Sequence, residues 1–186
     1  MTNMGMKNMS QKPGNAPSKT NGHTHTDQQE TAPLFNVHSI YLKDSSFEAP
    51  HSPQIFNEEW KPKIDFDLQT GSQVLSELEA IHEVVLRVTV TAKLGEEGAE
   101  KAAFLIEIQQ AGVFTVRNLA EEALKQVLAT TCPTVLFPYA RETISNLATR
   151  GGFPQLVLPP INFDAMYEHH MATQVAKMQE EGITTV

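Results

Sequence analysis

The chain has 186 residues, of which 40% are hydrophobic and 7% aromatic, and its formal net charge is -8. This size and composition allow one domain with a modest core. The excess of carboxylates argues against a nucleic-acid partner, because phosphate binding requires clustered lysines and arginines. The single cysteine, Cys132, cannot form an intramolecular disulfide, which fits a reducing compartment. The sequence shows neither a signal-peptide core nor a stretch of roughly 20 apolar residues that would span a bilayer, so we expect a cytoplasmic protein.

The two ends of the chain differ in composition from its centre. Residues 1–33 are rich in Asn, Gly, Ser, Thr, Gln, Lys and Pro and carry few apolar side chains apart from methionines. Such a segment cannot offset its ordering entropy by burial, so we expect a disordered extension. We expect the globular domain over residues 34–179 and a flexible tail over residues 180–186.

Between Phe35 and Gly112 the apolar residues recur at every second position, which is typical of half-buried strands. The clearest strand is Val84–Leu94, in which valines and a leucine alternate with arginine, threonines and lysine. Further strands are predicted at Val37–Lys43, Ile64–Leu68 and Ala102–Gln110, and the turn Gly95–Gly98 predicts a hairpin into the last of them. The pattern therefore predicts four antiparallel strands.

The strand Ala102–Gln110 has apolar residues on both of its faces. Phe104, Ile106 and Ile108 share one face, and Leu105 lies on the other beside Glu107. A second apolar face in a small domain indicates a subunit contact or a binding surface, because large exposed apolar patches are rare on monomers. The alternative is a loop that covers it.

After Gly112 the apolar spacing becomes helical. We predict a helix capped by Asn118 and ended by Pro133, and a second helix capped by Thr134 that ends at Gly151. Pro138 would then fall in the first turn of the second helix, where amides have no intrahelical partner.

The remaining part of the domain combines an extended segment with a third helix. Phe153–Pro160 is apolar but rich in proline, so we expect it to be extended. A last helix is predicted after Asn162, with one face formed by Phe163, Met166, Tyr167, His170, Gln174 and Met178. The sequence as a whole predicts an α+β fold with a four-stranded antiparallel sheet backed by helices.

Motifs for phosphate cradles, dinucleotide turns, nucleophile elbows and zincin helices do not occur in the sequence. His23 and His25 fall in the polar extension, and His169 and His170 would point about 100° apart on a helix, so we expect neither pair to hold a metal. Cys132 has no neighbouring base in the sequence and is interpreted as a structural thiol. We therefore expect no catalytic, cofactor or metal site.

Six stretches of the domain together resemble the SecB family of bacterial protein-export chaperones. They are Ile40–Pro50 (IYLKDSSFEAP), Glu83–Ala92 (EVVLRVTVTA), Gln109 and Gln110 with Gly112 and Phe114, Leu136–Glu142 (LFPYARE), Arg150–Leu156 (RGGFPQL) and Pro160–Asp164 (PINFD). Their order and spacing cover roughly residues 37 to 178. The resemblance implies an ATP-independent chaperone that binds unfolded preproteins, keeps them competent for translocation and delivers them to the SecA motor ATPase of the Sec pathway.

The resemblance also implies a homotetramer built as a dimer of dimers, with sheets paired edge to edge within a dimer and helices between the dimers. By position, the family's subunit-contact residues correspond to Ile106, Ile108 and Gln110. In the family, SecA docks on the outer face of the sheet through acidic residues and one leucine. By position, these correspond to Asp44, Glu48, Leu105 and Glu107. Without the resemblance, these carboxylates would be interpreted as solubilising charges.

In SecB-like proteins the clients lie in long grooves, and the groove residues implied here are Trp60, Phe137 and Phe153. Trp60 lies in a polar loop bounded by Pro62, so a half-exposed ring and a core anchor are both open interpretations. The C-terminal segment from Gln174 to Val186 departs from the family pattern, so a contact of this tail with SecA is not predicted.

Two other classes of function remain open from sequence. One is a structural module that oligomerises through the same elements but has no client groove. The other is a small-molecule-binding or catalytic protein, for which His82, Glu83 and Arg87 are the candidate polar groups.

Overall fold

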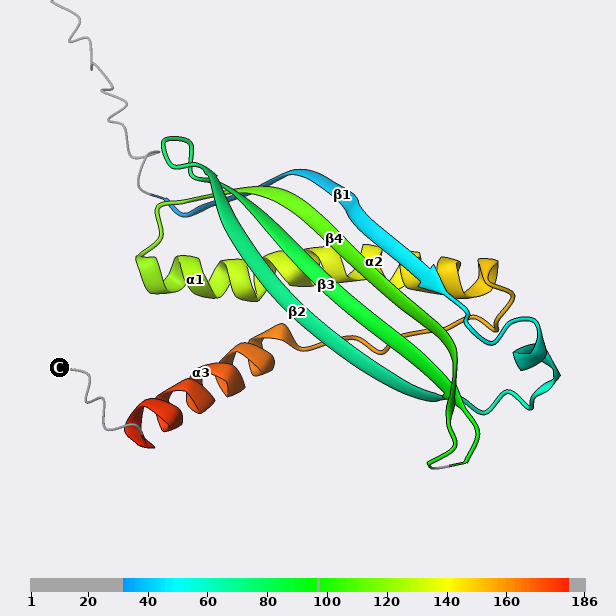
Figure 1. Cartoon of the computed structure of the whole chain (residues 1–186). Coiled ribbons are helices and arrows are strands. Elements are labelled where there is room, and N and C mark those ends of the chain that lie inside the picture. The colour runs from blue at the N-terminus through cyan, green and yellow to red at the C-terminus, as the bar shows by residue number, and fades with distance from the viewer. Residues whose placement is uncertain (1–31, 97, 181–186) are drawn as a thin grey trace, which may run out of the picture.

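The computed structural model describes residues 32–96 and 98–180 of the chain. Four strands are followed by three helices (Figure 1). The elements are β1 (Leu34–Glu48), the 3-10 turn η1 (Gln54–Asn57), β2 (Lys63–Ser76), β3 (Ile81–Leu94), β4 (Lys101–Arg117), α1 (Glu121–Ala129), α2 (Thr131–Arg150) and α3 (Phe163–Glu180). The predicted α+β class and the four antiparallel strands are confirmed.

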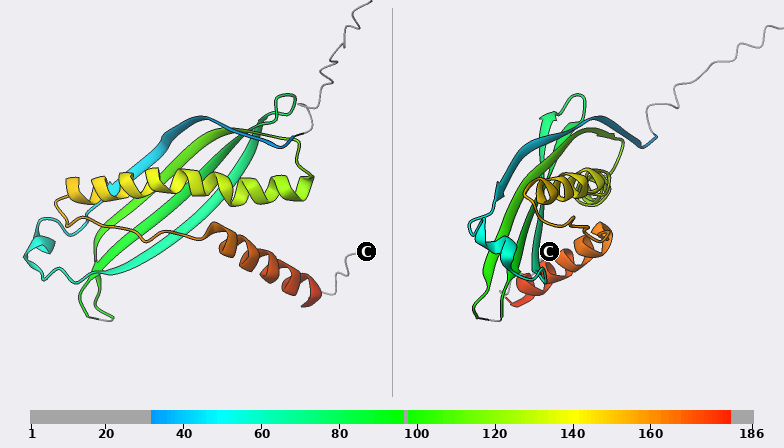
Figure 2. Two further views of the ribbon diagram at one scale, coloured as in Figure 1. Left: turned by 180° about the vertical axis from the view of Figure 1, so that it is seen from behind. Right: turned by 90° about the vertical axis from the view of Figure 1, so that its right-hand side faces the viewer.

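The four strands form one antiparallel sheet in the order β1-β4-β3-β2. β1 and β2 are therefore the two edges of the sheet. All three helices lie over the same face, as both views of Figure 2 show. We call this the inner face and the opposite one the outer face.

The core lies between the inner face and α2. Val84, Leu86, Val88, Val90 and Ala92 of β3 are at most 1% exposed, as the alternation of this strand predicts. Their partners on β4 include Ile106, Ile108 and Gly112. A Cβ atom at Gly112 would lie 2.9 Å from Leu136 Cδ2, so the missing side chain allows α2 to pack closely on the sheet.

The elements that the structure describes leave the outer face uncovered (Figure 2). Glu107 is exposed and Leu105 is partly exposed. The interpretation that a loop covers the second face of this strand is therefore not supported in the described part of the chain. A subunit contact or a binding surface remains.

The structure corrects the predicted end of β4. The strand runs seven residues beyond the predicted end at Gln110, to Arg117, because Phe114 and Val116 continue the buried alternation and are 0% and 3% exposed. Asn118 is not the helix cap: its φ of 59° turns the chain out of the strand, and its side-chain amide donates to the carbonyl of Ala32. Ala120 holds the N-cap position of α1 without a side-chain hydrogen bond.

The predicted boundary between the first two helices is also wrong. α1 ends at Ala129, and α2 already begins at Thr131, so Pro133 lies in the first turn of α2 rather than ending α1. A proline is accommodated there because amides of the first turn lack intrahelical partners. The Thr134 hydroxyl donates to the Thr130 carbonyl at 2.7 Å instead of capping a helix. Pro138 consequently lies inside α2 and not in its first turn.

An extended segment leads from α2 to α3, as predicted. Residues 154–162 have no regular secondary structure. The Asn162 side chain accepts a hydrogen bond from the Ala165 amide at 3.0 Å and so caps α3. Within residues 163–177 of α3 only Phe163 is buried. The predicted disordered extension, residues 1–33, and the predicted flexible tail, residues 180–186, lie outside the described residues except for residues 32, 33 and 180. No described helix combines the length and the hydropathy needed to cross a membrane.

Candidate functional site

The four residues predicted to bind SecA lie together on the outer face, on the neighbouring strands β1 and β4. Glu48 pairs directly with Leu105, and Asp44 pairs with Gln109 two positions beyond Glu107. We call Asp44, Glu48, Leu105 and Glu107 the docking cluster. Within residues 32–96 and 98–180, none of its three carboxylates forms an ion pair. The cluster therefore presents uncompensated negative charge around a partly exposed leucine, an arrangement suited to a cationic protein partner.

Two of the predicted groove residues, Trp60 and Phe153, belong to one aromatic cluster. Phe153 is its centre: its ring lies 5.5 Å from the Trp60 ring and 5.0 Å from those of Phe56 and Phe104. Trp60 is partly buried, and Phe56 remains 49% exposed. The Trp60 ring therefore packs on the core and is also partly accessible to solvent, so both interpretations left open by the sequence apply in part.

Phe137 lies apart from that aromatic cluster. It is 4% exposed, and its ring packs against Phe163 at the start of α3 with 5.9 Å between the centroids. The Arg141 guanidinium lies 5.9 Å above the Phe137 ring. In the single chain Phe137 supports the start of α3 and offers little surface of its own.

A concavity lies between the edge strand β2 and α3. It has a volume of about 500 Å³, and a further hollow of about 320 Å³ continues it along α3 to Gln174. Its lining includes Leu68 and Thr70 of β2, Ala129 of α1, and Phe163, Met166, Tyr167 and His170 of α3. We call this the α3 groove. Residues of the helix face predicted from the sequence thus form one wall of an open groove.

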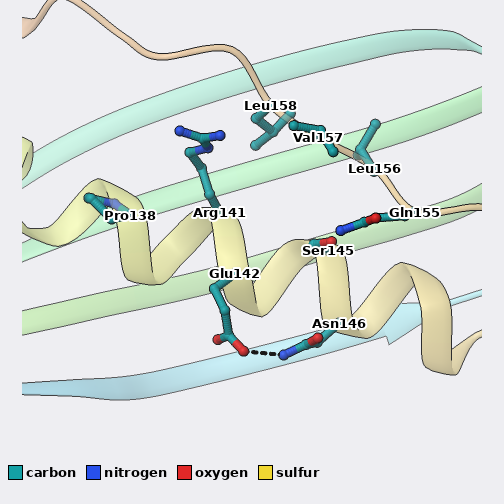
Figure 3. Close-up of a pocket in the computed structure, with 9 residues that line it drawn as sticks. All are labelled: Pro138, Arg141, Glu142, Ser145, Asn146, Gln155, Leu156, Val157 and Leu158. Carbon is teal, nitrogen blue, oxygen red and sulfur yellow. Dashed lines mark hydrogen bonds between the residues drawn. The ribbon is translucent and has the colours of Figure 1, made fainter.

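A third hollow, of about 380 Å³, lies on the helical side between α2 and the extended segment (Figure 3). Arg141 and Ser145 face the segment Gln155–Leu158, whereas Glu142 accepts a hydrogen bond from Asn146 farther along the helix surface. Val157 is 66% exposed beside it. This hollow could not be predicted from the sequence, because its lining residues show no common pattern.

The comparisons with known proteins identify the family of the chain. The family model described as preprotein translocase subunit SecB matches residues 28–174. The chain belongs to the SecB family. Membership confirms the function predicted from the sequence, that of an export chaperone whose partners are unfolded preproteins and the SecA motor.

One relative supports this membership, and one solved structure shares the fold. It is 47% identical over 167 residues to the protein-export protein SecB of Pseudomonas fluorescens strain SBW25, covering 87% of this chain and 99% of that protein. A solved structure of a Mycobacterium tuberculosis SecB-like chaperone in complex with an antitoxin peptide aligns with a TM-score of 0.57 at 19% identity, over 69% of this chain and 91% of that one. This second likeness concerns the fold alone.

The residues that correspond to the SecB subunit contact are covered within the single chain. Ile106, Ile108 and Gln110 are 0%, 2% and 3% exposed, on the inner face between β1 and β3. The Gln110 side-chain amide donates to the Tyr41 carbonyl of β1 at 2.9 Å. Their part in a SecB subunit contact stays a prediction. Because they are buried, they would affect such a contact through the positions of β1 and α2, which pack on them.

The polar groups considered for a small-molecule site do not converge in this SecB chain. His82 pairs with Phe114 on the inner face and is 5% exposed, and burial lowers the pKa of its imidazole. Glu83 and Arg87 lie on the outer face, with Val85 between them. Cys132 is fully buried, which raises the pKa of its thiol to about 12. No group of three or more potential metal ligands occurs among the described residues.

Proposed function

We propose that this chain is a cytoplasmic, non-enzymatic holdase that binds unfolded preproteins in the α3 groove and the Trp60 aromatic cluster and transfers them to SecA through the docking cluster. Holding requires no nucleotide, because apolar burial and backbone hydrogen bonds supply the binding free energy.

One observation carries the proposal: the two kinds of surface lie on opposite faces of one sheet. The α3 groove opens on the helical side, and the docking cluster lies on the outer face. A client and SecA can therefore contact the same subunit without competing for a surface. Simultaneous contact is what a transfer step requires.

The lining of the α3 groove suits an extended polypeptide of unspecified sequence. Leu68, Phe163, Met166 and Tyr167 offer apolar and polarisable contacts, and methionine adapts to side chains of different shapes. β2 is an edge strand, so one side of its backbone has no partner within the sheet. Apolar contacts combined with backbone pairing give broad selectivity without a sequence code.

We propose that the chain assembles as a dimer of dimers, with the first contact at the edge strand β1. This strand carries partly exposed apolar side chains on the side that faces the helices, where Phe35, Val37 and Leu42 are 39%, 37% and 45% exposed. α2 covers mainly β4 and β3 and leaves these residues open. A second copy would bury them and pair the free edge, which is the usual way for a sheet to remove a long exposed edge.

The test is refolding of a denatured, slow-folding preprotein with stoichiometric amounts of the native protein and no nucleotide, together with a native-mass determination. We expect refolding to stop and a tetramer to be found. Normal refolding beside an intact oligomer would leave only a structural module.

A pair of variants localises the client site. Met166→Asp places a charge in the α3 groove at a side chain that is 43% exposed, so the core is not disturbed. Ala172→Asp makes the same charge change on the exposed surface of α3, outside the groove lining. We expect the first variant to lose at least about tenfold in client affinity and the second to bind as the wild type does, because a desolvated charge opposes apolar burial. Equal affinities would place the client elsewhere.

A further inference from the structure

We propose that Glu83 is a positioning residue for SecA binding: it holds Lys43 away from the docking cluster and so preserves the negative charge of that cluster. The inference rests on the proposed docking cluster and adds a residue that does not itself touch the partner.

A β-bulge in β1 creates the need for such a residue. The register shifts between Leu42 and Asp44, so Lys43 is the extra residue on this strand. In a bulge two consecutive residues oppose one residue of the neighbouring strand, and their side chains can point to the same face. Here Asp44 belongs to the outer face, and Lys43 also reaches across that face to Glu83. The bulge thus places a cation directly beside one of the docking carboxylates.

Glu83 binds the ammonium group of that lysine from β3. The Lys43 Nζ donates to both carboxylate oxygens of Glu83 at 2.8 Å. The Tyr41 hydroxyl and the Gln73 side-chain amide donate to the same carboxylate. Glu83 is only 4% exposed. A buried carboxylate with three donors holds each of them firmly, because the loss of a donor would leave part of its negative charge buried without a partner.

The direction of the Lys43 side chain separates it from the docking cluster. Glu83 pairs with Val113 of β4, whereas Asp44 pairs with Gln109. These two β4 residues are four positions apart, which corresponds to about 13 Å along the strand. From Asp44, the cluster continues the opposite way, toward Glu107 and Leu105. Lys43 therefore extends away from all four docking residues.

A second cation on the outer face is also turned away. Arg87 lies in the same row as Gln109 and Asp44. Its guanidinium extends toward β2 instead, where its Nη1 lies 3.9 Å from the position that a Cβ of Gly71 would take. Both nearby cations thus point away from the cluster, which agrees with the absence of ion pairs on its carboxylates among the described residues.

Release of Lys43 would reduce the attraction for a cationic partner. Without an acceptor at Glu83, the ammonium group can rotate toward Asp44 and pair with it. The partner would then have to displace an internal counter-ion before it could use that carboxylate. The competing role for Glu83 is a purely mechanical one, in which it braces β1 against β3 and β2 across the small Ala111.

A double-variant experiment separates positioning from bracing. In the full-length protein, the near-isosteric Glu83→Gln removes the charge but keeps the size. We expect it to weaken SecA binding about three- to tenfold at low salt, with a smaller difference at high salt, because the effect is electrostatic. Adding Lys43→Gln to this variant removes the released cation, and we expect the affinity to return to within about twofold of wild type. Circular dichroism and native mass confirm that each variant is folded and assembled.

The controls fix the meaning of each result. Glu122→Gln makes the same change in net charge on α1, on the other side of the sheet, and should leave SecA binding unchanged. If the double variant binds as weakly as Glu83→Gln, or if Glu83→Gln binds as the wild type does, the positioning role is wrong. Leu105→Ala is measured in parallel: if it does not weaken SecA binding either, the docking cluster itself is misplaced, and the failure belongs to the proposed function.

Discussion

The two faces of the sheet are built from the same strands but serve different purposes. On β4, Ile106 and Ile108 are buried under α2, while the alternating residues Leu105 and Glu107 remain accessible. The even-numbered residues of this part of β4 thus pack in the core, and the odd-numbered ones form an accessible surface. This separation means that substitutions on the two faces should affect different measurements.

The largest effect is expected for truncation on the inner face. Ile106→Ala removes three carbons from a side chain that is fully buried against the β3 valines. It should lower the free energy of unfolding by about 2–5 kcal/mol. Its control on the outer face, Thr89→Ala, should change this free energy by no more than about 0.5 kcal/mol. Both are measured by chemical denaturation at equal protein concentrations, and similar losses would contradict the division between the faces.

The two glycines of the sheet test the same division with a single added carbon. Gly112→Ala places a methyl group 2.8 Å from the Phe114 ring and 2.9 Å from Leu136, so it should cost about 1–3 kcal/mol of stability by overpacking. Gly71→Ala on the outer face meets only the Arg87 Nη1 at 3.9 Å. We expect it to be neutral or stabilising, because alanine reduces the entropy of the unfolded chain by about 0.4–1 kcal/mol. Thermal unfolding of both variants decides the point, and an equally destabilised Gly71→Ala would contradict it.

On the outer face the expected loss is in binding and not in stability. Leu105→Ala should weaken SecA binding about tenfold, since an apolar side chain ringed by charges is a typical anchor of an interface. The free energy of unfolding should change by less than about 1 kcal/mol. Val157→Ala, at a 66% exposed apolar position on the helical side, is the matched control and should leave the affinity unchanged. Titration calorimetry with purified SecA measures both variants.

The smallest effect is a pH dependence of stability that comes from Glu83. Hydrogen bonds from Lys43 and Tyr41 lower the pKa of this carboxyl below 4.5. Its contribution is therefore complete above pH 4.5 and is lost as the pH falls through the lower pKa of the folded state. Denaturation curves between pH 6 and 3 should show a steeper decline of stability for the wild type than for Glu83→Gln. Parallel declines would show that other carboxylates dominate.

Sequence reasoning was most reliable where the alternation was strict. Val84–Leu94 is a strand with the predicted face buried, and the period of two through Ala102–Gln110 located both the core residues and the accessible leucine. The errors fell on boundaries, where local signals compete. Asn118 has the residue type of a helix cap but is used for a left-handed turn, and Pro133 has the type of a terminator but occupies a first turn.

The candidate surfaces were only partly predictable. The docking residues could be carried over by position, and strand register then brought them together. The α3 groove could not be predicted, because a helical apolar stripe has the same pattern whether it is buried or lines a groove. The bond between Lys43 and Glu83 depends on a β-bulge, and one extra residue in a long strand leaves no signal in an alternating pattern.

The position of β1 in the sheet has a consequence for synthesis. In the sheet that residues 32–96 and 98–180 form, its only neighbour is β4, and Leu34 pairs with Arg117, so the first strand to be made must wait for the last. At roughly 5–20 residues per second the intervening residues take several seconds to emerge. Throughout that interval Phe35, Val37 and Leu42 have no neighbour to cover them, and closure of the sheet then requires a contact between distant parts of the chain, which is slow. A protein that shields the unfinished chains of others thus passes through an exposed, unfinished state of its own.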